Sequence, residues 1–140
     1  MKRIFLILVI LFSLTVLCSS SCKKNSQPDC GCDAPTRTTI QDSANLIGTI
    51  YFSTQQTVLN SAYFANKYYI VYTEINCTNC VHTMVICNEA ILPQRVLDLK
   101  LTNQSLQVKF AGHLKPFCEK IIAPGDYTYE NLILTKIEIQ

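Results

Sequence analysis

Cysteine is the residue type whose number and spacing suggest chemistry most directly in this chain. The 140 residues include eight cysteines. Six of them lie beyond residue 28: Cys30, Cys32, Cys77, Cys80, Cys87 and Cys118. An even number of cysteines in a small exported domain usually indicates disulfides, and six allow fifteen connectivities among which sequence alone does not choose. We therefore expect all six to form disulfides, with Cys77 and Cys80 bonded either to each other or to Cys30 and Cys32.

A thiol-redox site is the first alternative to disulfides. Cys77-Thr78-Asn79-Cys80 has the C-x-x-C spacing of thiol oxidoreductases, in which a helix N-terminus lowers the pKa of the first thiol. Here the motif is followed by VHTMVIC, which has the composition of a strand. Covalent haem attachment needs C-x-x-C-H, but Val81 stands between Cys80 and His82. The sequence therefore favours neither a catalytic dithiol nor a haem.

A metal site is the second alternative. Four thiolates, from Cys30, Cys32, Cys77 and Cys80, would suit zinc or copper(I), and His82 is a possible further ligand. This site requires the N-terminal segment to fold back onto the loop that holds the C-x-x-C motif. The disulfide hypothesis is the simpler one, and it predicts no cofactor.

The N-terminus has the pattern of an export signal. Lys2 and Arg3 precede an apolar run over residues 4–17, which is too short for a bilayer core of about 30 Å. The run is followed by Ser19-Ser20-Ser21-Cys22-Lys23-Lys24, which resembles the lipobox of bacterial lipoproteins, and the SSCKK stretch is similar to lipoproteins of the Bacteroidota. The resemblance implies a signal peptide over 1–21 and lipidation of Cys22. Cys18 is the rival acceptor, but the bulky Leu17 precedes it.

Lipidation would place the protein in the cell envelope. Two or three acyl chains on Cys22 are enough for stable anchoring. We expect an outer-membrane protein that faces the periplasm, with the cell surface as the alternative, since no acidic stretch follows Cys22. Loss of Lys2 and Arg3 with the signal peptide takes the formal charge from +2 to about zero. A neutral surface excludes phosphate-backbone binding as the main function, so the expected partners are the membrane and an envelope protein, and not nucleic acid.

The remaining chain is long enough for one domain of about 119 residues. Residues 22–45 are polar, carry two prolines and lack an apolar period, which predicts a flexible tether that ends where a domain over 46–140 begins. Because the tether offers little apolar surface, residues 46–140 are expected to fold without it.

Apolar alternation predicts strands over 47–53, 67–75, 81–89, 105–116 and 131–140. In the last strand Ile133, Ile137 and Ile139 are expected on one face. Pro93 and the spacing of Val96 and Leu99 predict one short helix over 92–103, between the third and fourth strands. The β-β-β-α-β-β order resembles the OB-fold, a five-stranded Greek-key barrel, and a small β-sandwich is the alternative.

Two observations bear on function. The aromatic residues Tyr63, Phe64, Tyr68, Tyr69 and Tyr72 gather around the second predicted strand, where an OB-like barrel carries part of its usual binding face, although such residues are commonly barrel wall. The acidic residues are scattered over different elements, and neither a Ser/His/Asp signature nor a Gly-rich phosphate loop is present. We therefore expect a non-catalytic structural or protein-interaction module, with a metal-binding or thiol-redox module as the alternative.

Overall fold

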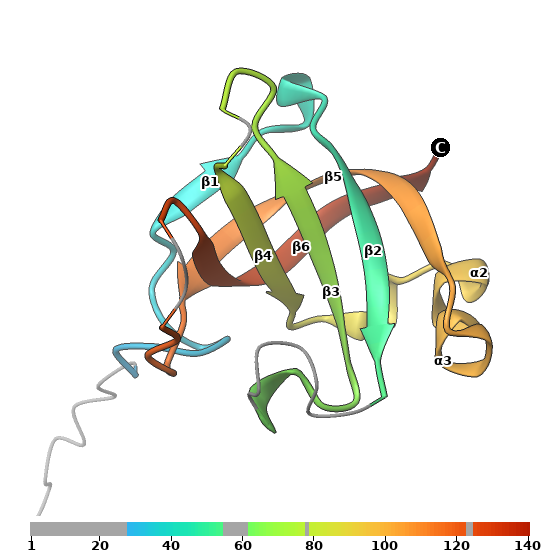
Figure 1. The fold of residues 1–140 in the computed structure, drawn as a ribbon, viewed down its shortest axis with the longest axis horizontal. Helices are drawn as coiled ribbons and strands as arrows, with labels where there is room; N and C mark the ends of the chain where they lie inside the picture. The colour runs from blue at the N-terminus through green and yellow to red at the C-terminus, as the bar shows by residue number, and fades with distance from the viewer. Residues whose placement is uncertain (1–27, 55–61, 78, 123–124) are drawn as a thin grey trace, which may run out of the picture.

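The chain folds into a barrel of β-strands (Figure 1). The computed structural model describes residues 28–54, 62–77, 79–122 and 125–140. The barrel strands are β2 (Ile47–Ser53), β3 (Lys67–Thr73), β4 (Val81–Ile86), β5 (Ser105–Pro116) and β6 (Thr128–Ile139). Antiparallel pairings join β2 to β3, β3 to β4, β6 to β5 and β5 to β2, while β4 and β6 are parallel. These pairings close the barrel.

The order of the elements is that of an OB-like barrel. Between β4 and β5 lie the 3₁₀ helix η4 (Glu89–Ile91) and two helical turns, α2 (Gln94–Leu97) and α3 (Leu99–Thr102). They form the one short helical segment expected between the third and fourth barrel strands. A second 3₁₀ helix, η3 (Ala62–Phe64), lies between β2 and β3. The mainly β fold and the OB-like barrel are therefore confirmed.

Alternate side chains of the strands fill the barrel. The interior contains Ile50, Ile70, Met84, Val108, Phe110 and Leu132, all at most 1% exposed. Val96 and Leu99 are the buried residues of α2 and α3, and they join the same core. Tyr68 lies in this core and donates its hydroxyl proton to the Leu97 carbonyl oxygen at 2.7 Å. The helical segment is thus held to the barrel by apolar contacts and by this partly buried hydrogen bond.

A bulge in β6 changes the predicted face of one residue. Along the β5–β6 pair, Ala111 lies opposite Lys136 and Gly112 lies opposite Leu134, so Thr135 is the extra residue of β6. An extra residue reverses the alternation of side chains beyond it. Leu132 and Leu134 are therefore buried before the bulge, and Ile137 and Ile139 contact the core after it. The prediction that Ile133 shares the face of the later isoleucines is wrong for this reason.

The described part of the N-terminal segment, residues 28–45, lies on the barrel. This N-terminal strap contains a strand, β1 (Thr38–Ile40), which pairs with β5, and a 3₁₀ helix, η2 (Asp42–Ala44). The Gly31 amide donates to the Pro116 carbonyl at 2.9 Å, and Ala34 is completely buried. The prediction of a flexible tether up to residue 45 is therefore wrong for residues 28–45. Their polar sequence offers little apolar surface to bury, but cross-links and backbone hydrogen bonds attach them to the barrel.

Candidate functional site

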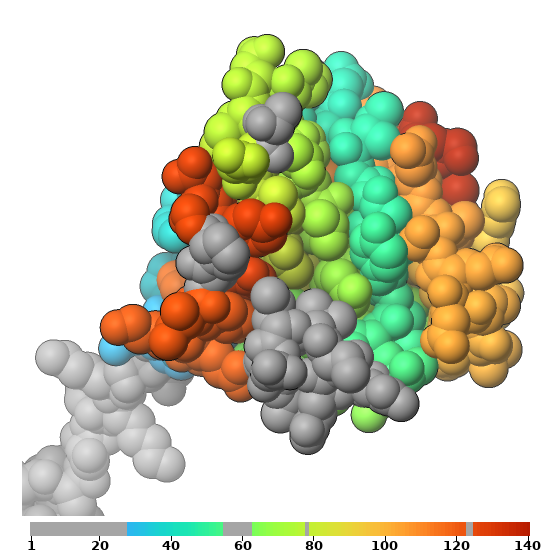
Figure 2. Space-filling view, in the orientation of Figure 1, coloured from blue at the N-terminus to red at the C-terminus, as the bar shows by residue number. Residues whose placement is uncertain are grey.

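A cleft of about 450 Å³ opens between the strap and the ends of β3 and β4. Its walls come from β1, β3, β4, β5, β6 and the loop after β3. The lining residues are Ile40, Leu46, Tyr72, Glu74, Ile75, Asn76, His82, Met84, Leu114 and Glu130. The loop after β3 projects at one end of the molecule, beside the turn of η2 (Figures 1 and 2). The cleft is therefore built from segments far apart in the sequence, and the strap forms one of its walls.

The imidazole of His82 is fixed on the polar side of this cleft. Its Nε2 lies 2.9 Å from a carboxylate oxygen of Glu74, and its Nδ1 lies 2.6 Å from the hydroxyl of Thr128. The ring of Tyr72 stacks on the imidazole with centroids 5.8 Å apart and an interplanar angle of 26°. Because both ring nitrogens have protein partners, the imidazole is positioned as part of the wall.

The floor of the cleft combines apolar side chains with a buried carboxylate. Met84 and Leu114 are 1% and 8% exposed, and Glu130 is 3% exposed. Arg37 of the strap donates a hydrogen bond from its guanidinium to Glu130, while its own side chain remains 58% exposed. Among the described lining residues there is no lysine, cysteine or serine. The cleft thus suits an apolar group that also carries hydrogen-bond donors, since its polar groups include two carboxylates.

The structure joins the six cysteines in three disulfides. Cys30 bonds Cys118 and Cys32 bonds Cys87, so both cysteines of the strap are linked to the barrel. Cys77 bonds Cys80, which is one of the two pairings expected for the C-x-x-C motif. The other expected pairing, in which Cys77 and Cys80 are bonded to Cys30 and Cys32, is not formed. The strap reaches Cys118, after β5, and Cys87, after β4.

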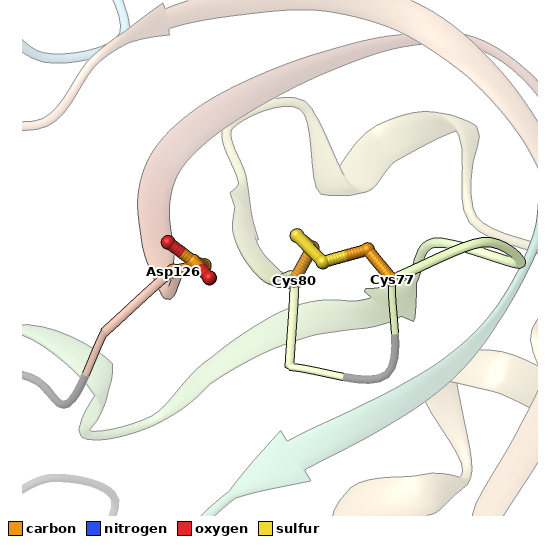
Figure 3. Close-up of side chains that lie close together, drawn as sticks. All are labelled: Cys77, Cys80 and Asp126. Atoms are coloured by element: carbon orange, nitrogen blue, oxygen red, sulfur yellow. A yellow bond between two sulfur atoms is a disulfide. The ribbon is translucent and has the colours of Figure 1, made fainter.

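The four-thiolate metal site, which was the alternative to disulfides, is not assembled. Cys30 and Cys32 are linked to Cys118 and Cys87 and not to Cys77 or Cys80, and the imidazole of His82 is held by Glu74 and Thr128. A different group forms in the described part of the chain. The ligand atoms of Cys77, Cys80 and Asp126 all lie within 4.8 Å of one another (Figure 3). Asp126 lies in the turn ahead of β6, and the sequence carries no signal that this turn meets the C-x-x-C loop.

The aromatic residues divide between the core, the cleft and a second cluster. Tyr72 lines the cleft, whereas Tyr68 is in the core. Outside the barrel core, ring contacts connect a satellite cluster of Tyr63, Phe64, Tyr69, Phe117 and Tyr129. Phe64 is fully buried there, so most of the predicted aromatic set is structural. Glu130 and Arg37 have no sequence signal, because a single acid in a strand and a single base in a polar segment have no distinctive spacing.

Some expectations lie outside the described residues. The signal peptide, Cys18 and the lipidation candidate Cys22 all precede residue 28. In the ranges that the structure describes, no helix is both long and apolar enough to span a bilayer.

No protein-family model matches the chain, and a search of curated proteins found no significant match.

Proposed function

We propose that the protein is a lipid-anchored lipoprotein of the cell envelope whose OB-like barrel acts as a non-catalytic structural or protein-interaction module. The anchor is inferred from Ser19-Ser20-Ser21-Cys22 directly after the apolar run. The interaction role rests on one observation, the cleft with apolar walls, a fixed imidazole and the carboxylates of Glu74 and Glu130. The outer membrane, facing the periplasm, is the proposed location, and the cell surface is the alternative.

The chemistry of the cleft supports binding over catalysis. General acid–base catalysis needs a titratable group that can reach a substrate. The only described histidine of the cleft already has a partner at each ring nitrogen. The buried carboxylate of Glu130 is paired with Arg37. These partners fix the imidazole and the buried carboxylate as parts of the wall, and the Glu74 carboxylate, whose side chain is 49% exposed, can still accept a hydrogen bond from a bound group.

The proposed anchor is tested by replacing the acceptor thiol. Cys22→Ala should abolish palmitate labelling and membrane association, and it should leave the precursor unprocessed, because lipidation requires that thiol. Cys18→Ala is the matched control and should be labelled like the parent. Labelling that persists in Cys22→Ala and disappears in Cys18→Ala would place the anchor at Cys18 instead.

The proposed interaction is tested with a photo-crosslinking amino acid in place of Ile75. This side chain lines the cleft and is 91% exposed, so the replacement should not disturb the fold. Thr135, which is exposed at the bulge of β6, provides the control position. Irradiation of intact cells should give a discrete adduct with an envelope protein from position 75 and none from position 135. Glu74→Lys combined with the probe should reduce the yield of that adduct. Equal adducts from both positions, or none from position 75, would refute the proposal.

A metal-binding or thiol-redox module is the second candidate. The observation that favours it is the proximity of Asp126 to the Cys77–Cys80 pair.

A further inference from the structure

We propose that reduction of the Cys77–Cys80 disulfide creates a zinc site formed by the thiolates of Cys77 and Cys80 and the carboxylate of Asp126. This inference is independent of the proposed interaction at the cleft. It rests on the stability that each disulfide supplies, on the backbone of the C-x-x-C loop and on the position of Asp126.

The three disulfides differ in what they contribute to the fold. Cys30–Cys118 and Cys32–Cys87 span sequence separations of 88 and 55 residues, whereas Cys77–Cys80 spans three. In the chain-entropy model the stabilisation grows with the logarithm of the length of the closed loop, so each long cross-link stabilises the fold more than the short one does. Cys77–Cys80 is therefore the disulfide that the fold can lose most readily.

The loop around the short disulfide has its own backbone hydrogen bonds. The Cys80 amide donates to the Cys77 carbonyl at 3.1 Å, and the Cys77 amide donates to the Glu74 carbonyl at 3.2 Å. The Glu74 amide in turn donates to the Cys80 carbonyl at 3.1 Å. These bonds do not involve the sulfur atoms, so they can keep both cysteines on one turn after reduction. C-x-x-C on a turn has the ligand spacing of structural zinc sites.

Asp126 supplies a third ligand from a separate part of the chain. It lies in the turn ahead of β6, and Figure 3 shows its carboxylate beside the disulfide. All ligand atoms are within 4.8 Å of one another, while the edge of a tetrahedron with zinc–sulfur bonds of about 2.3 Å is about 3.8 Å. Only small side-chain movements are needed to surround one ion. A water molecule would complete four-coordination.

The donor set favours zinc over copper(I). Thiolates suit both ions, but a carboxylate oxygen is a common zinc ligand and a poor ligand for copper(I). Cys77 and Cys80 are partly exposed and Asp126 is exposed, so the ion can enter from solvent.

The reaction requires a dithiol reductant, such as a reduced thiol–disulfide exchange protein. Its two thiols transfer two electrons and two protons to the Cys77–Cys80 disulfide, which becomes two thiols while the reductant becomes a disulfide. Binding of Zn²⁺ then releases two protons from these thiols.

The first test is selective reduction of the full protein, extracted from membranes in detergent. Graded dithiothreitol should release two thiols per chain before any others, and alkylation followed by peptide mapping should locate them at Cys77 and Cys80. Earlier or simultaneous release of the thiols from Cys32–Cys87 or Cys30–Cys118 would overturn the proposal.

The second test is metal binding after anaerobic removal of the reductant. One equivalent of Co²⁺, used as a spectroscopic substitute, should give a thiolate-to-cobalt charge-transfer band, and one equivalent of Zn²⁺ should remove it. The unreduced protein and Cys77→Ser/Cys80→Ser should show no band. Asp126→Asn should weaken binding about tenfold or more, while the charge-matched control Asp98→Asn should bind as the parent does. Absence of the band, its persistence in the double serine variant, or equal affinities of the two asparagine variants would each overturn the site.

Discussion

At the scale of single residues, polar side chains take the place of backbone partners where the strands end. Asn88 follows β4 and continues its pairing with β6: the Asn88 amide group donates to the Leu134 carbonyl, and its side-chain oxygen accepts from the Leu134 amide, both at 2.8 Å. Asn131, completely buried, donates to the Pro116 carbonyl at 3.0 Å and accepts from the Tyr63 hydroxyl at 2.6 Å. Each of these asparagines thus joins two polar groups through its side-chain amide.

Asn88→Ala should lower the free energy of unfolding by about 2–3 kcal/mol, because it leaves both backbone groups of Leu134 without their partner. Asn79→Ala, at an exposed position, is the control and should stay within about 0.5 kcal/mol of the parent. Urea unfolding at pH 7 measures both values. Equal midpoints for the two variants would show that water replaces the Asn88 side chain without cost.

Four tyrosines that are partly or fully buried predict a loss of stability in alkali. Burial is the main cause that raises the pKa of Tyr63, Tyr68, Tyr69 and Tyr129 above the ordinary value of 10.0. The folded state therefore favours the neutral phenol, and its contribution is complete below the pKa of the unfolded chain. That contribution is lost as the pH rises through the raised values of the folded state. The urea midpoint should fall above about pH 10, together with delayed ionisation of these four tyrosines in phenolate absorbance. A midpoint that is unchanged between pH 8 and 11 would contradict this.

The cysteines show which features of the site can be predicted from residue types alone. Their number and the exported context indicated disulfides, but each partner depends on which loops meet in the folded barrel. Asp126 illustrates the same difficulty, because 45 positions of sequence separate it from the C-x-x-C motif and only the pairing of β4 with β6 brings the two turns together.

At the scale of elements, strands whose residues alternate regularly between apolar and polar are predicted correctly from the sequence. The bounds predicted for 47–53 and 105–116 are those of β2 and β5. The predictions failed where alternation is interrupted or short. The bulge at Thr135 reverses the faces of β6, and β1 has three residues, too few for a period to be visible. The predicted helix over 92–103 is divided into α2 and α3.

Gly112 is required at the bulge, because a β-carbon there would lie 2.3 Å from the Ile133 carbonyl oxygen and 2.8 Å from a Leu132 methyl carbon. Neither backbone nor core can move away cheaply, so Gly112→Ala should lower the free energy of unfolding by about 2–4 kcal/mol. Gly125→Ala is the control: a β-carbon there meets nothing within 4 Å, and only its φ of +51° adds a cost of about 1 kcal/mol. Thermal unfolding of both variants tests the difference. A smaller loss for Gly112→Ala than for Gly125→Ala would show that the β5–β6 register shifts easily.

At the scale of the whole molecule, the N-terminal strap connects the cleft to the stability of the barrel. Ile40 of β1 lines the cleft, and Arg37 pairs with the buried Glu130. The buried ammonium of Lys115 donates to the Ala34 carbonyl at 2.6 Å. The sequence of the strap offers few apolar residues, so composition predicted a tether. Its attachment depends on two disulfides and on buried charges, which hydrophobic periodicity does not detect.

The contacts of the strap lead us to expect, against the sequence-based prediction, that residues 46–140 do not fold alone. A chain that begins at Leu46 lacks both long cross-links, each corresponding to about 4–5 kcal/mol. Lys115 and Glu130 remain in its barrel but lose their partners in the strap. An unpaired buried charge costs about 3–5 kcal/mol, and the whole stability of a domain is about 5–15 kcal/mol. Residues 46–140 should thus lack a cooperative thermal transition at pH 7, while residues 28–140 should retain one.

Two control variants separate the causes of this loss. Cys32→Ser/Cys87→Ser in the 28–140 chain removes one long cross-link and should lower the midpoint more than Cys77→Ser/Cys80→Ser, because it opens the longer loop. Adding Lys115→Met and Glu130→Gln to the 46–140 chain should recover part of its structure, since these changes remove the unpaired charges. A 46–140 chain that unfolds cooperatively at the midpoint of the 28–140 chain would show that the strap contributes only to the wall of the cleft.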